Sequence, residues 1–259
     1  MKVKDIVAAL EEFAPLGYQA PKDNSGLQIG SPDQEVTGVL IGFDCTAALV
    51  GEARRRSCNL IITHHPLFYH PLYGLDPSDP AAAAVMAAVK DGIAVYSSHT
   101  CADRTPGGVS YVMASRLGLK NVRTLCPDAE GVGFGAVGDL PEAMDAASAI
   151  AFVKKTFGIP VVRTSALVDV PVKTIAMCGG SGTSLIGEAI ASGAQLYLCG
   201  DIGYHFFFMP KGFMVADVGH FESEVAIVDV FSSVIRKKFP NFVPLVSEDI
   251  SHSNPVNYL

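Results

Sequence analysis

The sequence predicts an α/β protein made of two units, each with a mainly parallel or mixed sheet and helices on its faces. Short apolar segments typical of buried strands alternate along the chain with amphipathic segments typical of helices. The 259 residues, 49% of them hydrophobic and 17% charged, are enough for one large domain or two small ones. Several apolar segments also run directly into His and acidic residues, as happens at the carboxyl edge of an open sheet.

In the first part of the chain, Ile6, Leu10 and Phe13 form the apolar stripe of an N-terminal helix. Asp79 followed by Pro80 is a typical helix start, and Gly92 is well placed to end that helix. A loop covers 23–30. The remaining elements expected here are strand 36–43, helix 46–56, strand 60–63, helix 80–91, strand 93–98 and helix 108–117.

The chain is expected to change unit near residues 125–128. The elements expected beyond that point are an edge strand 131–138, helix 144–157, strands 161–168 and 172–178, helix 184–192, strand 195–199, a short helix after Asp201, strand 213–218, helix 222–239 and strand 243–246. The last strand would return to the first sheet. We therefore expect a first unit of residues 1–125 plus 240–259 and a second unit of residues 126–239.

Composition excludes several classes of protein. A formal charge of −7 argues against non-specific nucleic-acid binding. The six cysteines form no C-x-x-C pair and are expected to be free thiols in a reducing compartment. The N-terminus lacks the apolar core of a signal peptide, and no apolar run is long enough for a membrane span. These features predict a soluble cytoplasmic protein.

His64 and His65 directly follow the apolar segment 60–63 and precede Pro66. Adjacent side chains of an extended strand point to opposite sides, so this pair suits two neighbouring metal ions better than one unless the backbone turns at Pro66. The alternative is a pair of polar residues at a strand exit, one of which caps a turn. Two imidazoles after a buried strand favour the metal interpretation.

Two further segments place His and a carboxylate four residues apart after a strand: His99 with Asp103, and His220 with Glu224. On a helical turn this spacing puts both side chains on one face. Imidazole nitrogen together with carboxylate oxygen suits Zn, Mn, Fe or Ni better than Ca. Taken singly, Asp103 fits a turn, Glu224 a first-turn glutamate and His220 a cap, so the metal prediction depends on all the segments together.

Two segments remain open to alternative interpretations. The glycine-rich run 179–182 can bind an anion through backbone N–H groups, or it can serve tight packing. His205 and Tyr204 follow the strand 195–199 and can transfer protons in the same site, or His205 can lie on a helix surface below an Asp201 cap. His70 and His252 are assigned no role.

The chain resembles the NIF-three-like family, whose members are named GTP cyclohydrolase I type 2 homologues. The resemblance covers almost the whole chain, in the family's order. It rests on Asp23-Asn24-Ser25-Gly26-Leu27-Gln28, Thr63-His64-His65-Pro66, His99-Thr100 with Asp103, Pro106-Gly107-Gly108, Gly179-Gly180-Ser181-Gly182, Gly200-Asp201 with Tyr204-His205, and Gly219-His220 with Glu224.

The resemblance implies a dinuclear metal centre at the strand ends between the two units. Its ligands would be His64, His65, Asp103, His220 and Glu224, with Glu224 bridging two divalent ions and one histidine of the pair serving each. His99 and His205 would be catalytic residues near the metals. It also implies a toroidal homohexamer, a trimer of dimers, with this chain the short form that lacks a central insertion.

Two residues depart from the family pattern. Cys101 stands where the family usually has asparagine, and a thiol there can add a soft ligand. The aromatic residue usual before the Asp-Asn segment is absent. These departures leave the ligand set intact and bear on the shape of the substrate.

The expected function is a metal-dependent hydrolase that acts on a nucleotide such as GTP, or a related small metabolite, through metal-activated water. Hydrolysis of phosphoesters is the nearest alternative chemistry. An alternative from another class is a non-catalytic metal-binding assembly that handles metal or serves as a platform for protein interactions. Rapid turnover of one metabolite would exclude that alternative, and silence across a broad substrate panel would favour it.

Overall fold

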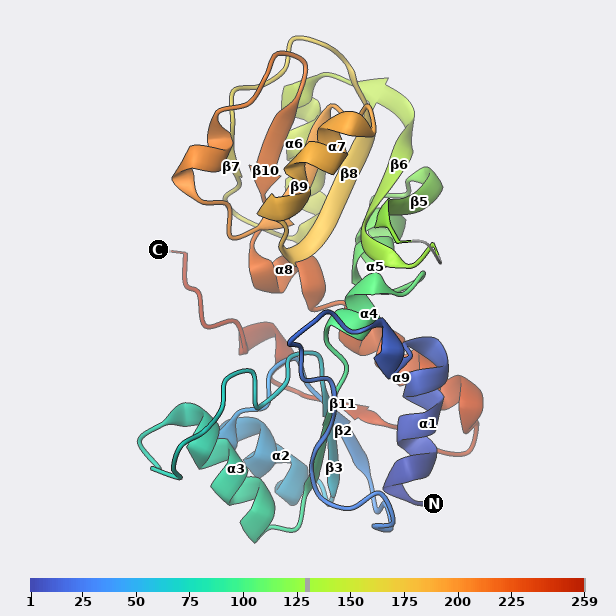
Figure 1. The fold of residues 1–259 in the computed structure, drawn as a ribbon, viewed down its shortest axis with the longest axis vertical. Helices are drawn as coiled ribbons and strands as arrows, with labels where there is room; N and C mark the ends of the chain where they lie inside the picture. The colour runs from blue at the N-terminus through green and yellow to red at the C-terminus, as the bar shows by residue number, and fades with distance from the viewer. Residues whose placement is uncertain (129–130, 259) are drawn as a thin grey trace. The chain divides into compact units, whose positions relative to one another are not determined.

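The computed structural model describes residues 1–128 and 131–258 (Figure 1). The chain forms two compact units, the first of residues 1–102 with 227–255, and the second of residues 103–226 with the end of the chain from residue 256. Each unit contains one sheet with helices packed on it, so the predicted α/β class is confirmed. Within the described ranges, no helix has the length and apolar content needed to span a bilayer.

The sheet of the first unit is mainly parallel. Its strands, in spatial order, are β1 (Gly26–Ile29), β4 (Ala94–Ser97), β3 (Leu60–Thr63), β2 (Val39–Ile41) and β11 (Leu245–Val246). Only β1 among them runs antiparallel to its neighbour, β4. The predicted return of the C-terminal strand to this sheet is confirmed by β11, whereas β1 occupies a segment that was expected to be a loop.

The helices of the first unit are α1 (Val3–Phe13), α2 (Ala47–Arg55), α3 (Pro80–Lys90) and α9 (Ile227–Lys238). The pair α2 and α3 covers one face of the sheet, and α1 packs with α9 on the other (Figure 1). The carboxylate of Asp79 accepts a hydrogen bond from the N–H of Ala82 at 2.8 Å, and Pro80 is the first helical residue. Gly92, just past this helix, has a φ of 64°, so both predicted ends of α3 are confirmed.

The sheet of the second unit is mixed. Its strands, in spatial order, are β5 (Lys120–Pro127), β6 (Gly133–Met144), β8 (Val172–Ser181), β9 (Leu196–Gly200), β10 (Met214–Asp217) and β7 (Arg163–Thr164). The central strands β8, β9 and β10 are parallel, and the outer pairings are antiparallel. The prediction of an edge strand at 131–138 was wrong, because β6 lies between β5 and β8 and hydrogen-bonds to both.

Side chains alternate along β8 between two apolar layers. Ile175 and Met177 pack with helices α5 (Val109–Arg116) and α6 (Ala146–Phe157), whereas Ala176 packs with α7 (Ile186–Ala191) on the opposite face. Helices therefore cover both faces of the second sheet, as expected for a doubly wound arrangement.

The unit boundaries in the structure, 102/103 and 226/227, differ from those expected at 125/126 and 239/240. Helix α5 belongs to the second unit because Met113 and Leu117 are part of the core under its sheet. The segment expected as one helix over 222–239 is two helices, α8 (His220–Glu224) and α9, assigned to different units. Lys238, in the basic last turn of α9, forms a 2.7 Å ion pair with Glu12 of α1, which belongs to the same unit.

Candidate functional site

In the first unit, candidate donor side chains follow two neighbouring parallel strands. β3 ends at Thr63 and is followed directly by His64 and His65, and β4 ends at Ser97, two residues before His99. Thr63 and Ser97 are paired in register, so the two strand ends lie side by side. The N–H groups of His64 and His65 both donate to the carbonyl of Phe43, at 3.1 and 3.3 Å. The backbone therefore turns out of the strand at this point. Such a turn is needed if both imidazoles are to face the same site.

The three imidazoles of the first unit form a cluster. Their ring centres are separated by 5.0 Å for His64 and His65, 5.3 Å for His64 and His99, and 5.4 Å for His65 and His99. One nitrogen of each ring lies within 4.8 Å of one nitrogen of each of the other two. His64 is completely buried, and His65 and His99 are partly buried. The strand ends thus bring together two predicted ligands and one predicted catalytic residue.

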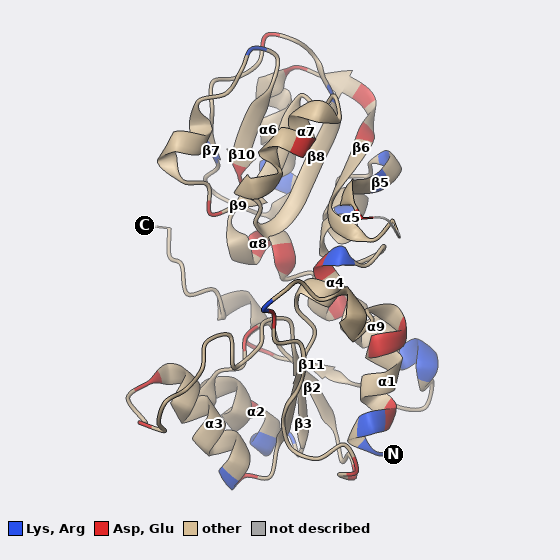
Figure 2. Cartoon of the chain, in the orientation of Figure 1, with Lys and Arg blue, Asp and Glu red and all other residues tan. Residues whose placement is uncertain are grey.

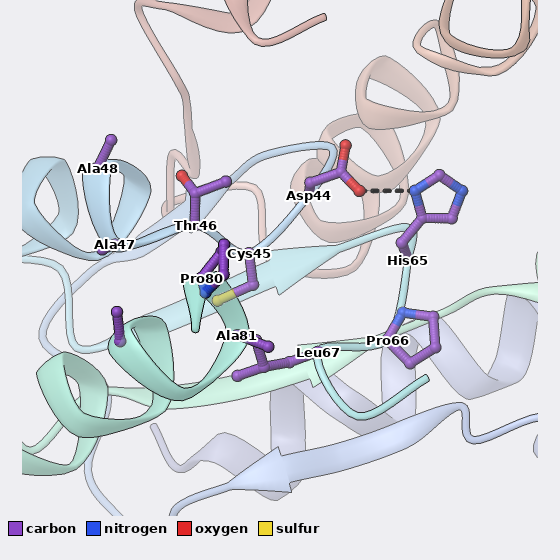
Figure 3. A pocket seen from close by; sticks show the side chains of 11 residues that line it. Asp44, Cys45, Thr46, Ala47, Ala48, His65, Pro66, Leu67, Pro80 and Ala81 are labelled. Carbon is purple, nitrogen blue, oxygen red and sulfur yellow. Dashed lines mark hydrogen bonds and ion pairs between the residues drawn. The ribbon is translucent and has the colours of Figure 1, made fainter. Parts of the chain in front are cut away.

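Each of these imidazoles uses its Nδ1 atom for a hydrogen bond within the first unit. His65 Nδ1 lies 2.7 Å from Asp44 Oδ1 (Figure 3), His99 Nδ1 lies 2.7 Å from Asp23 Oδ1, and His64 Nδ1 lies 3.0 Å from the carbonyl oxygen of Ser98. Carboxylate and carbonyl oxygens accept hydrogen bonds, so Nδ1 carries the proton in each ring. Nε2 is then the nitrogen of each ring without a proton, the atom through which an imidazole can bind a metal ion or accept a proton.

Asp23 is the most strongly held of the supporting carboxylates. Burial disfavours its charge, but hydrogen bonds from His99, Thr100 and the N–H of Asn24 outweigh burial and hold the pKa of Asp23 well below its usual range. Only 3% of its side chain is exposed, compared with 37% for Asp44. Asp23 is therefore a carboxylate, fixed in place, at neutral pH.

The second unit contributes a donor set richer in acids. Helix α8 begins at His220, and Gly219 before it has a φ of 83°, a conformation that favours glycine. His220 Nε2 lies 3.1 Å from Glu224 Oε2, so the predicted pairing across one helical turn is confirmed. His220 Nδ1 lies 2.7 Å from Asp201 Oδ2, which repeats the arrangement of carboxylate and imidazole seen in the first unit. Helix α8 carries two glutamates, and the acidic positions are coloured red in Figure 2.

Asp103 lies on the short helix α4 (Thr100–Arg104), as its spacing from His99 predicted. One carboxylate oxygen of Asp103 lies within 4.8 Å of one of Glu224. Burial, followed by the charges of Asp103, Cys199 and Glu224, raises the pKa of Cys178 well above its usual value. The second set therefore places two acids and an imidazole in a region of negative potential, where a cation is favoured.

The glycine-rich segment supports the packing interpretation. Strand β8 runs through Gly179 and Gly180 to Ser181, so these glycines are part of the sheet. A Cβ atom on Gly180, whose φ is 59°, would collide with Oε1 of Glu224, and one on Gly179 would collide with the side chain of Val109. The N–H of Gly180 donates to the hydroxyl of Ser223 at 3.0 Å. Glycine here allows α8 to lie directly on the strand.

His205 lies on the short 3-10 helix η3 (Tyr204–Phe207) and is exposed, with its ring 5.3 Å from that of Tyr204. Tyr204 and Phe208 are also largely exposed, 72% and 70%, so this segment of the second unit presents an aromatic surface. Cys101 is completely buried, and its sulfur lies 3.3 Å from the hydroxyl of Ser98.

A pocket of about 380 Å³ opens beside His65 within the first unit (Figure 3). It lies at the N-terminal ends of α2 and α3, and its walls are mostly small apolar side chains. Asp44 and His65 supply polar groups at one side, where their hydrogen bond is drawn. Residues lining it include Cys45, Ala48, Leu67 and Ala81.

Sequence reasoning missed the carboxylates that support the imidazoles. Asp44 follows β2 closely and Asp201 directly follows β9, so position at a strand exit was a usable signal for both. Asp23 lies in a loop 76 residues from its partner His99, and its position in the chain gives no such signal.

Comparison with known proteins agrees with this architecture. The family model Duf34/NIF3 (NGG1p interacting factor 3) matches residues 1–254. Proteins named GTP cyclohydrolase 1 type 2 homolog are 34% identical over 247 residues in Lactococcus lactis and 29% identical over 250 residues in Clostridium perfringens, covering 93% and 95% of both chains.

Solved structures show the same fold. A Bacillus cereus protein related to NIF3 superposes with a TM-score of 0.93 at 22% identity, covering 100% of this chain and 99% of the other. A Staphylococcus aureus hypothetical protein gives a TM-score of 0.92 at 25% identity, with the same coverage. The chain therefore belongs to the Duf34/NIF3 family.

Proposed function

We propose that this chain binds two divalent transition-metal ions and uses them to hydrolyse a small metabolite, with a nucleotide such as GTP as the first substrate class to test. The proposed ligands are His64, His65, Asp103, His220 and Glu224. The observation that carries the proposal is the orientation of the His64 and His65 imidazoles: in each, Nδ1 is held by an oxygen acceptor, which makes Nε2 the proposed metal-binding atom. His220 also has Nδ1 on a carboxylate, and its Nε2 lies 3.1 Å from Oε2 of Glu224, the acid proposed to share a metal ion with it.

The donor chemistry fits a divalent transition metal. Neutral imidazole nitrogens together with carboxylate oxygens are the ligands of Zn, Mn, Fe and Ni sites. Two carboxylates at close range in the second unit repel each other, and a cation relieves that repulsion. The carboxylates of Asp44 and Asp201 lie 2.7 Å from Nδ1 of His65 and His220, so these imidazoles are ordered before a metal ion binds.

When bound, divalent ions would lower the pKa of water towards neutrality and so supply a nucleophile at neutral pH. His99 and His205 are the proposed groups for moving protons. His99 is partly buried in the imidazole cluster, whereas His205 is exposed on η3. The pocket beside His65 is the proposed location for the apolar part of a substrate, because its volume falls in the range of small-molecule sites.

The names of the relatives motivate the choice of GTP, since they are called GTP cyclohydrolase 1 type 2 homologs. The resemblance also implies a homohexamer, which we include in the proposal. The exposed aromatic surface of Tyr204 and Phe208 supports an association of subunits, because exposed apolar patches often mark interfaces.

The test compares the wild type with His65→Ala and with His70→Ala, which removes an exposed histidine with no proposed role. Each protein is reconstituted with Zn, Mn, Fe or Ni, analysed for bound metal, and assayed on GTP and on p-nitrophenyl phosphate. We expect metal binding and turnover in the wild type and in His70→Ala, and a loss of both in His65→Ala. Metal content and activity that survive undiminished in His65→Ala would refute the proposal.

Metal binding without turnover of GTP, phosphoesters or a wider panel of metabolites would instead support a non-catalytic metal-binding assembly. The same samples therefore test metal binding and hydrolysis separately.

A further inference from the structure

Asp23 is a buried carboxylate in the loop before β1, and the proposed metal chemistry gives it no role as a ligand. We propose that Asp23 is a positioning residue, which holds the imidazole of His99 so that its Nε2 atom faces His64 and His65 and can accept a proton there. This inference rests on the proposed function, because it assigns the partner of a proton-transfer group in that same site.

Both oxygens of Asp23 are fixed by hydrogen bonds. Oδ1 accepts from His99 Nδ1 at 2.7 Å and from the N–H of Asn24 at 2.8 Å. Oδ2 accepts from the N–H of Thr100 at 3.1 Å, from the hydroxyl of Thr100, and from the hydroxyl of Ser25 at 2.9 Å. The carboxylate therefore has one defined orientation, and only its Oδ1 side faces the imidazole.

The bond to Asp23 fixes both the rotation and the tautomer of His99. A carboxylate accepts and does not donate, so the ring proton of neutral His99 resides on Nδ1 and Nε2 is left as a base. The ring meets those of His64 and His65 nearly edge-on, at interplanar angles of 70° and 72°. One nitrogen of each ring lies within 4.8 Å of one nitrogen of each of the other two. Because Nδ1 of His99 is bonded to Asp23, its Nε2 is the nitrogen proposed to reach a water held beside the ligands.

The pair of Asp23 and His99 differs from the pair of Asp44 and His65 in its burial. The exposed fractions of the side chains are 3% and 16% for the first pair, and 37% and 23% for the second. A hydrogen bond to a charged group is stronger where water is excluded, so Asp23 has the firmer hold on its imidazole.

Asp23 also ties its loop to α4, and this structural role must be separated from the positioning role. The hydrogen bonds to Thr100 and Ser25 are made by Oδ2, whereas the hydrogen bond to His99 is made by Oδ1. Thr100→Val removes a hydroxyl donor from Oδ2 and leaves the bond between Asp23 and His99 in place. It is therefore the matched control for Asp23→Asn.

Asp23→Asn is expected to reverse the tautomer of His99. The oxygen of the new amide is favoured at the Oδ2 position, where three donors converge against two at Oδ1. Its NH₂ group then faces His99, at the cost of the bond from the N–H of Asn24. An NH₂ group donates to Nδ1, which moves the ring proton to Nε2 and removes the base. Replacement of the aspartate by asparagine in the serine protease triad has this effect.

The experiment is long-range ¹H–¹⁵N NMR of the histidine rings in the metal-free full chain, with His99 assigned through His99→Gln. We expect Nδ1 of His99 to be protonated in the wild type and in Thr100→Val, and Nε2 to be protonated in Asp23→Asn. A wild-type spectrum with the proton on Nε2, or an Asp23→Asn spectrum like the wild type, would overturn the inference. The wild-type spectrum alone decides the question if Asp23→Asn does not fold.

Metal content and turnover of the same variants separate this inference from the proposed function. Asp23→Asn is expected to bind as much metal as the wild type and to lose about 100-fold in kcat with KM little changed, within the usual contribution of a general base. Absence of metal from the wild type would defeat the proposed function and leave the NMR result intact. A normal kcat together with a reversed tautomer would overturn the assignment of proton transfer to His99.

Discussion

The donor side chains of the two units differ in charge and in the way they are held. The first unit presents three imidazoles at the ends of two parallel strands, each ring with Nδ1 on an oxygen acceptor. The second unit presents one imidazole and two acids, on α4 and on α8. Imidazoles carry no negative charge and can be assembled without a cation, whereas acids at short range repel one another until a cation arrives. We therefore expect bound metal to stabilise the second unit more than the first.

The largest effect is expected from Glu224→Gln, which removes one of the two acids without changing the shape of the side chain. We expect the affinity for Zn to fall by more than about 100-fold, the upper range for loss of a supporting residue. Competition with a chromophoric chelator measures the affinity. Glu222→Gln, on the same helix, is the control and should stay within a few-fold of the wild type. Equal affinities in both variants would remove Glu224 from the ligand set.

The supporting carboxylates offer a direct comparison between the units. Asp44→Asn and Asp201→Asn each disturb a 2.7 Å bond to the Nδ1 atom of a proposed ligand. We expect each to weaken Zn binding by about 10- to 100-fold. The same chelator competition gives both values side by side. If either variant binds Zn as tightly as the wild type, the carboxylate that it lacks does not orient its imidazole for metal binding.

Gly180→Ala tests how tightly α8 lies on the second sheet. The added Cβ would collide with the carboxylate of Glu224, whereas Gly193→Ala has a similar positive φ and meets no atom within 4 Å. The two variants share the backbone strain, so their difference reports the collision. We expect Gly180→Ala to lower the free energy of unfolding by about 1–3 kcal/mol more than Gly193→Ala, measured by urea denaturation. Equal losses would show that Glu224 moves aside freely.

A buried acid of the first unit provides the contrast, because its charge is satisfied without a metal. Glu52 is 5% exposed and accepts hydrogen bonds from Arg56, from the hydroxyl of Ser247 and from the N–H of Glu248. Burial opposes its ionisation, but these bonds outweigh it, and the pKa of Glu52 lies below the ordinary 4.5.

A lowered folded-state pKa gives stability that is fully present above the unfolded value and is lost as pH falls through the folded value. We therefore expect the wild type to lose stability below about pH 4.5 and Glu52→Gln to lose less over the same window. Urea denaturation between pH 3 and 6 measures both, in the manner usual for linkage of protons and folding. Parallel curves for the two proteins would show that Glu52 does not titrate with a shifted pKa.

The parts of this protein that were predictable from sequence are those set by local chemistry. The ends of α3 follow from the Asp79 cap, Pro80 and Gly92, and the paired spacing of His220 and Glu224 gives one face of a helical turn. The apolar segment before His64 predicts a buried strand, and in the structure every residue of β3 is buried.

The parts that were missed depend on contacts between distant segments. Strands β1 and β5 are only partly buried, so neither shows a clear apolar pattern, and each is a strand because it pairs with a neighbour. The partners of the imidazoles are equally remote: Asp44 is 21 residues from His65, and Asp201 is 19 residues from His220. Only the folded chain brings these carboxylates to the rings they orient.

The most direct test of the account is a crystal structure of the zinc-reconstituted protein, with anomalous scattering recorded at the zinc edge. We expect anomalous peaks about 2.0–2.1 Å from the Nε2 atoms of His64, His65 and His220, while their Nδ1 atoms keep their oxygen partners. Fully reconstituted crystals with no peak at these side chains, or with zinc bound through Nδ1, would contradict it.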